Sequence, residues 1–224
     1  MVPEYGHLAL IIAFILSIIL SVVPMLGTFT GRVIWMNAGR PLASGVFVFT
    51  LAAFLVLVYS FLQDDFTVKY VASHSNTLLP DFYKVTAVWG GHEGSVLLWA
   101  LVLTGWTIAV AMFSSELPLP VLSRVLSVMG GVSTGFLAFI LFTSNPFDRL
   151  LPNPVKEGND LNPLLQDIGM IIHPPTLYMG YVGFSVCFAF AIAALIGGRL
   201  DSSWARWSRP WTNMAWVFQT LGIM

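Results

Sequence analysis

Charged residues are scarce in this chain, and their scarcity restricts the kind of protein that it can be. Only 9% of its 224 residues are Asp, Glu, Lys or Arg, whereas 57% are hydrophobic. Soluble domains carry about 25% charged residues, so the composition excludes a soluble enzyme and predicts a polytopic membrane protein. The formal net charge is −1, which gives no sign of a nucleic-acid partner. The partner that the composition does imply is membrane lipid.

Cysteine is nearly absent as well. Cys187 is the single cysteine and lies within an apolar run, so an internal disulfide, a CxxC motif and a thiol redox pair are excluded. The four histidines are dispersed, without a His-x₃-His or Cys/His cluster. Because zinc and copper sites need such clustered ligands, the residue pattern predicts neither.

Long apolar runs divide the chain into six helical segments of one membrane domain. A helix needs about 20 apolar residues to cross the hydrocarbon core, and the first five segments approach that length. The sixth covers only about 14 residues, too few to span, which predicts a continuation in a longer protein or a second chain. The expected segments are 8–27, 41–62, 95–113, 124–143, 176–196 and 211–224. The expected fold class is an all-α transmembrane helix bundle over residues 1–224.

Basic and acidic residues alternate between the connections. Arginines concentrate after the first segment, at the start of the fourth and after the fifth, whereas the longer connections 63–94 and 144–175 are rich in Asp and Glu. The positive-inside rule places the arginine connections in the cytoplasm, and the N-terminus and the acidic loops outside. The arginines concerned are Arg32, Arg40, Arg124, Arg199, Arg206 and Arg209.

The middle of each expected span is free of Asp, Glu, Lys, Arg and His. Ion and proton translocators place ionisable groups at that depth, because the chemistry needs charge there. This absence counts against an ion-translocating subunit of a membrane complex. That interpretation is kept as an alternative, together with a non-catalytic assembly scaffold.

The stretch 161–181, LNPLLQDIGMIIHPPTLYMGY, has the most specific local pattern. Asn162 followed by Pro163 is a helix start, with a side-chain cap and then a residue of preset φ. Apolar residues recur at helical spacing from there to Ile172. The pattern predicts a short amphipathic helix that lies at the membrane surface before the fifth span.

His173 follows this expected helix. The residue before a proline is disfavoured in the α region, so we expect the chain to turn at His173 and the next helix to open at Pro174 and Pro175. An imidazole framed in this way is a candidate iron ligand, with one ring nitrogen free. From the spacing alone, a structural histidine that makes its hydrogen bonds at a corner of the chain is equally favoured.

The first acidic loop ends in the motif WGGHEG. Its residues of interest are Trp89, Gly90, Gly91, His92 and Glu93. The glycine pair allows an unusual backbone turn, and the glutamate suits the dipole of the helix that follows. The simpler interpretation is a capped helix with interfacial aromatics, in which the histidine bonds at the surface. The functional interpretation is a turn that lines a cofactor or partner groove, whereas His74 is expected to be an ordinary loop residue.

Three runs now suggest a family. WGGHEGSVLLW at 89–99, SNPFDRL at 144–150 and DLNPLLQDIGMIIHPPTLYMGYVGFS at 160–185 closely resemble the CcmF/NrfE family of bacterial cytochrome c-type biogenesis proteins, and the resemblance extends from end to end of the chain. It implies a haem-binding and haem-transport role in the cell inner membrane. The protein would be a subunit of the haem lyase (holocytochrome c synthase) complex. It would accept haem b from a CcmE-like chaperone and, with CcmH/CcmI-like subunits, help to attach it to apocytochrome c on the periplasmic side.

The resemblance also implies a role for His173. In the family it corresponds to the first of two external histidines that bracket a tryptophan-rich WWD segment and hold the incoming haem iron. The WWD segment, the second histidine and the transmembrane histidines of a permanent haem site are expected outside residues 1–224. The chain would then be the N-terminal portion of a CcmF-like protein, would supply one axial ligand and would not be active alone. The catalytic residues and the cytochrome c that is served are left open.

Overall fold

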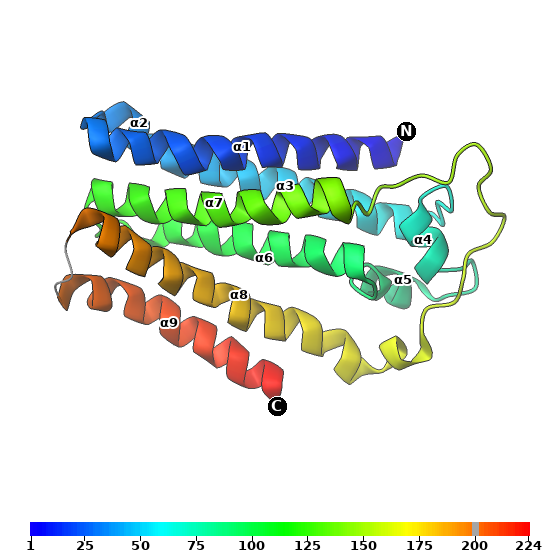
Figure 1. The fold of residues 1–224 in the computed structure, drawn as a ribbon. Coiled ribbons are helices and arrows are strands. Elements are labelled where there is room, and N and C mark those ends of the chain that lie inside the picture. Colours follow the sequence, from blue (N-terminus) through cyan, green and yellow to red (C-terminus); the bar gives the residue numbers. More distant parts are fainter. Residues whose placement is uncertain (199–201) are drawn as a thin grey trace.

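Long helices run side by side and form the body of the molecule (Figure 1). The structure, a computed structural model, describes residues 1–198 and 202–224. The first five long helices in chain order are α1 (Val2–Thr30), α3 (Gly39–Leu62), α6 (His92–Phe113), α7 (Leu119–Thr143) and α8 (Ile168–Gly197). Each is long and apolar enough to cross a membrane, α3 together with the short α2 (Val33–Asn37) that precedes it. The predicted all-α membrane bundle is confirmed, and each of the first five predicted segments falls within one long helix.

The sixth apolar segment belongs to a longer helix than the sequence suggests. Helix α9 (Ser202–Ile223) has 22 residues and contains Pro210 in its interior. Its predicted start at 211 is wrong because the helix continues through the polar, arginine-bearing residues before the proline. Among the described residues, α9 is not one of the helices that meet the requirements for a span.

Glycines bring α9 close to α8, and the two helices lie antiparallel (Figure 1). A Cβ at Gly180 would lie 2.4 Å from the Cα of Gln219, and one at Gly222 would lie 2.6 Å from the Cα of Leu177. Small residues of this kind let membrane helices pack backbone against backbone, where dispersion contacts drive association. The glycines in these two helices therefore set the close α8–α9 pairing.

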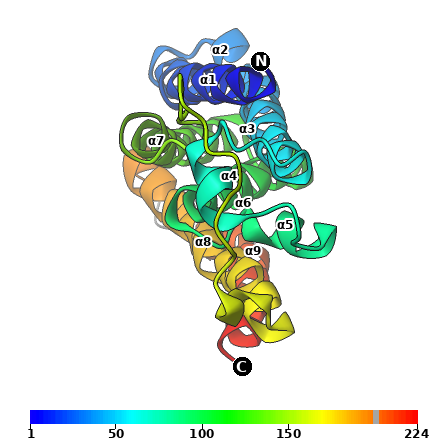
Figure 2. The same cartoon turned by 90° about the vertical axis from the view of Figure 1, so that its right-hand side faces the viewer.

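The connections lie at two opposite ends of the bundle (Figure 1). The connections from α1 to α3 and from α6 to α7, the last turn of α8 and the first turn of α9 lie at one end. The N-terminus, α4 (Lys69–His74), α5 (Asp81–Ala87) and the chain between α7 and α8 lie at the other (Figures 1 and 2). The arginine-bearing connections are thus grouped opposite the acidic loops, as the charge alternation predicts. Arg199 lies outside the described residues.

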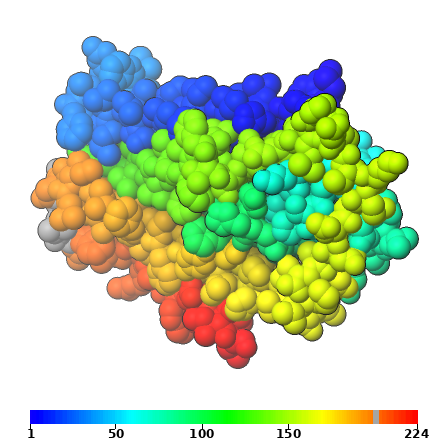
Figure 3. All heavy atoms as spheres, turned by 45° about the vertical axis from the view of Figure 1, so that its right-hand side comes forward, coloured from blue at the N-terminus to red at the C-terminus, as the bar shows by residue number. Residues whose placement is uncertain are grey.

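The two acidic loops fasten to each other over the end of the bundle (Figure 3). Val68 and Arg149 form an isolated antiparallel β-bridge. The Glu157 carboxylate accepts hydrogen bonds from the backbone N–H of Thr77 at 2.9 Å and from its hydroxyl at 3.0 Å. These links join the two acidic loops to each other at the end of the bundle where α6 and α8 begin. The candidate site lies at this end.

Candidate functional site

Two caps follow one another at the start of the segment that carries His173. Asn162 accepts a hydrogen bond from the backbone N–H two residues on, as its predicted capping role requires, but it begins only the short 3₁₀ helix η1 (Pro163–Gln166). The carboxylate of Asp167 then caps α8, which begins at Ile168. The predicted amphipathic helix is therefore reduced to η1, and the residues after Asp167 belong to the spanning helix.

The predicted corner at His173 is wrong, because α8 passes through His173, Pro174 and Pro175 without a break. Proline has no backbone N–H, so Pro175 leaves the carbonyl of Ile171 without its helical donor. The indole Nε1 of Trp89 donates to that oxygen at 3.3 Å. Tertiary contact thus satisfies a group that the proline orphans, and this support outweighs the local preference against helix before proline. His173 itself lies exposed in the second turn of α8.

The WGGHEG turn therefore lies directly against the His173 segment. A Cβ at Gly90 would lie 3.1 Å from the Cδ1 of Leu161 and 3.2 Å from that of Leu165, so the turn packs on η1 as well as on α8. The sequence placed both motifs in neighbouring loops but did not predict their contact. The turn is the nearest fixed support of the helix that presents His173.

Tyr70 on α4 holds the turn from the other side. Its hydroxyl accepts from the backbone N–H of Gly91 at 2.9 Å and donates to the carbonyl of Val88 at 3.0 Å. Burial raises the pKa of the Tyr70 hydroxyl, which keeps it protonated and able to donate. Sequence reasoning missed Tyr70, because nothing in the local run KYVASH distinguishes it.

The glycines of the turn are needed for space rather than for an unusual backbone, which corrects the prediction. Gly91 has an extended φ of −127°, but its Cβ would lie 2.5 Å from Nε2 of His74. A Cβ at Gly94 would lie 1.7 Å from the carbonyl oxygen of Val88. His74 packs under the turn, with its Nδ1 2.9 Å from the carbonyl oxygen of Tyr70. His74 is therefore a packed residue at the end of α4 and not the loop residue that the sequence predicts.

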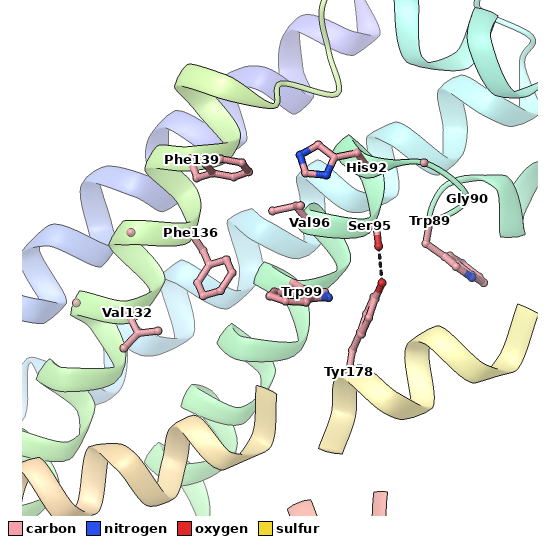
Figure 4. A pocket seen from close by; sticks show the side chains of 13 residues that line it. Trp89, Gly90, His92, Ser95, Val96, Trp99, Val132, Phe136, Phe139 and Tyr178 are labelled. Atoms are coloured by element: carbon pink, nitrogen blue, oxygen red, sulfur yellow. Dashed lines mark hydrogen bonds between the residues drawn. The ribbon is translucent and has the colours of Figure 1, made fainter. Parts of the chain in front are cut away.

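Polar contacts also fasten α6 to α8 below the turn. The hydroxyls of Ser95 and Tyr178 lie 2.6 Å apart (Figure 4). Further along α6, the indole Nε1 of Trp106 donates to the carbonyl of Met179 at 3.2 Å. Together with the Trp89 bond, these contacts hold the N-terminal half of α8.

An open groove of about 790 Å³ lies between the turn, α6, α7 and α8 (Figure 4). Its walls are largely aromatic, and His92 stands beside it. The prominent side chains are His92, Trp99, Phe136, Phe139 and Tyr178. The first four residues of WGGHEG line the groove, whereas Glu93 and His173 do not. The aromatic wall on α7 was missed, although Val132, Phe136 and Phe139 have the spacing of one helical face.

Within the described residues, no three His, Cys, Asp or Glu side chains converge to hold a metal ion. A lone histidine such as His173 or His92 could supply one axial ligand to iron that is held in haem.

Comparison with known proteins gives a consistent result. The family model described as cytochrome c assembly protein matches residues 89–224. The chain is 62% identical over its whole length to the cytochrome c-type biogenesis protein CcmF of Pseudomonas aeruginosa and 59% identical to that of Escherichia coli. It is 47% identical to NrfE of Haemophilus influenzae.

A solved structure named cytochrome c heme lyase CcmF matches the fold with a TM-score of 0.85 at 30% identity, over 99% of this chain. The chain spans about a third of these proteins, 34% of the Pseudomonas protein and 35% of the solved chain. The family model covers more than half of the residues, and the predicted CcmF/NrfE likeness is confirmed. The chain therefore belongs to the cytochrome c assembly protein family.

Proposed function

We propose that this chain acts in cytochrome c maturation as part of the membrane subunit of a haem lyase complex. The relatives that match it from end to end are named cytochrome c-type biogenesis proteins, and the solved relative is named a haem lyase. Its partners would be a CcmE-like haem chaperone, CcmH/CcmI-like subunits, apocytochrome c and the remainder of a CcmF-like protein. Haem b is the substrate that is handed on.

The observation that carries the proposal is the placement of His173. Its imidazole is exposed in the second turn of α8, at the end of the bundle with the acidic loops, and Trp89 braces the helix two residues before it. A histidine held on a rigid helix can bind iron at little entropic cost. His173 would donate one axial ligand to the haem iron, while Pro174 and Pro175 stiffen the helix behind it.

The decisive test replaces His173 in the complete natural protein. His173→Ala should abolish most of the holocytochrome c yield and alter the visible spectrum of bound haem. Ile172→Ala is the matched control, because Ile172 is the exposed neighbour on the same helix. A normal yield with unchanged spectra in the His173→Ala protein would reject the ligand assignment.

The proposal also requires the acidic end of the bundle to face the periplasm. That orientation follows from the arginines of the opposite end. A His173→Cys variant in a Cys187→Ser background should react with a membrane-impermeant thiol reagent added to the periplasmic side. Reaction only after the cytoplasmic side is opened would reject the proposed topology.

The WGGHEG turn is proposed to support the haem site. Trp89 and Gly90 contact the segment that carries His173. Leucine at Gly91 meets the His74 ring, whereas leucine at Gly90 meets only flexible leucine side chains and the Ala87 carbonyl. Gly91→Leu should therefore impair maturation more than Gly90→Leu. Full maturation with both replacements would count against this role.

A further inference from the structure

Among the described residues, His92, like His173, has an exposed ring without a hydrogen-bond partner in the protein, whereas His7 and His74 do not. His7 and His74 each have a ring nitrogen within hydrogen-bond distance of a partner. Within residues 1–198 and 202–224, the exposed His92 imidazole makes no hydrogen bond, and it meets only the edge of Phe139 at 5.9 Å between ring centroids. Both ring nitrogens are therefore open to a ligand.

The groove beside His92 has the volume and the largely apolar lining of a small-molecule site. Its volume of about 790 Å³ lies within the usual range for small-molecule sites, roughly 300–1,000 Å³. The Trp99 and Phe136 rings lie 5.5 Å apart between centroids at an interplanar angle of 55°, and Trp99 meets Tyr178 edge to face at 5.4 Å, so three aromatic rings adjoin in the wall of the groove (Figure 4). On the α7 side Gly135 leaves open space, since a Cβ there would meet nothing within 4 Å.

We propose that this groove is a haem-docking site separate from His173, with the His92 imidazole as an axial ligand of the iron. The inference rests on the proposed function, which supplies haem as the cargo. An acyl chain or a partner helix would use the apolar walls but not the free imidazole. A planar porphyrin with a coordinating metal uses both, because its faces pack on aromatic rings and its iron binds a ring nitrogen.

Trp89 connects the two haem positions. It lines the groove and donates its indole hydrogen bond to the carbonyl of Ile171, beside His173. The groove therefore borders the same turn that supports the helix of His173. The groove is suited to hold haem before the His173 site takes it.

The test is a haem titration of the complete natural protein in detergent, made in a His173→Ala background so that His173 does not contribute. Ferric haem is added, and the Soret spectrum and the stoichiometry are followed. Adding His92→Gln, which keeps side-chain length without a good iron ligand, should remove one equivalent of imidazole-type binding or weaken it at least about tenfold. His7→Ala is the control for loss of a histidine at the same end and should leave the titration unchanged.

A second variant tests the groove without touching the ligand. Gly135→Phe fills the open space and should reduce haem binding as strongly as His92→Gln, while the protein keeps its melting temperature. Equal stoichiometry and affinity with and without His92, or with Gly135→Phe, would overturn the inference, as would binding without an imidazole-type spectrum. Those results would leave the His173 assignment intact. Normal maturation in His173→Ala cells would instead defeat the proposed function and leave the titration standing.

Discussion

The indole nitrogen of Trp89 lies 3.3 Å from the carbonyl oxygen of Ile171, the acceptor whose helical donor is lost at Pro175. This contact joins the WGGHEG turn to the helix that carries His173. It satisfies the acceptor that Pro175 frees and so supports the helix at that point, since an orphaned backbone acceptor in an apolar setting is costly. The two motifs therefore act as one structural unit.

Loss of this indole donor should loosen the start of α8. Trp89→Phe keeps an aromatic ring but removes the hydrogen bond, with an expected net loss of about 1 kcal/mol. Amide hydrogen exchange over 168–176 should accelerate by about fivefold, the factor that corresponds to this free energy. Trp216→Phe, at an exposed ring on α9, should have no such effect. Unchanged exchange in Trp89→Phe would show that the prolines need no outside donor.

The first turn of α6 should not accept a methyl group at Gly94. Its Cβ would lie 1.7 Å from the carbonyl oxygen of Val88, and backbone cannot yield as a side chain does. Gly94→Ala should lower the free energy of unfolding by at least roughly 1–3 kcal/mol, the range typical of overpacking. It should also lower the melting temperature in detergent. Gly135→Ala is the matched control, because its Cβ meets open space and alanine favours helix. Equal melting temperatures for the two variants would contradict the packing at the turn.

A buried ion pair holds α5 to the end of α3. The Nζ of Lys84 lies 2.6 Å from the Oδ2 of Asp64, with Lys84 almost fully buried and Asp64 partly exposed. Lys84→Met or Asp64→Asn should each destabilise by about 2–3 kcal/mol, near the lower limit for breaking a buried pair. Asn tolerates the left-handed backbone at position 64, where φ is 50°.

The double variant Lys84→Met/Asp64→Asn should lose less than the sum of the single losses, with a coupling free energy of about 1–3 kcal/mol. Chemical or thermal unfolding of the four proteins gives this value. Additive losses would mean that the two charges do not interact in the folded protein.

The link between the two acidic loops should weaken in acid. Hydrogen bonds from the backbone N–H and then the hydroxyl of Thr77 hold the pKa of the Glu157 carboxyl below its usual value. A lowered pKa in the folded state means that the ionised Glu157 carboxylate stabilises the link between the two acidic loops. The contribution is complete above about pH 4.3, the ordinary glutamate pKa, and is lost as pH falls through the lower folded-state pKa.

Limited proteolysis of the 150–160 segment at graded pH should therefore show faster cleavage under acidic conditions in the parent protein. Glu157→Gln has no carboxyl to titrate and should show a flatter pH profile. A parent profile as flat as that of the variant would mean that this carboxylate does not control the loop.

The helices themselves were largely readable from local pattern. Apolar runs near 20 residues predicted the five long helices, because backbone groups in a bilayer must be satisfied within their own helix. The start of α9 was predicted too late, since the prediction followed the apolar run, whereas the helix also contains the polar residues before Pro210. The corner at His173 failed for a different reason, because a proline's effect depends on what else reaches the freed carbonyl.

Only part of the candidate site could likewise be predicted from local sequence. WGGHEG could be recognised as a special turn, but Tyr70, which holds it, and the aromatic wall on α7 lie far from it in the chain. Their roles arise only when α4, α6, α7 and α8 come together, and no local spacing encodes that meeting. The need for Gly94 likewise depends on a carbonyl that approaches to contact distance.

By itself, the sequence determined an all-α membrane protein, the order of its long helices, the segregation of arginines from acidic loops and the likeness to its family. These features depend on hydrophobic length and on charge, which are properties of the chain read residue by residue. Only the tertiary structure decided that His173 stands within a helix, that Trp89 supports it, and that His92 borders an aromatic groove. Those facts depend on which distant groups satisfy a carbonyl or leave a ring free, and packing alone determines that.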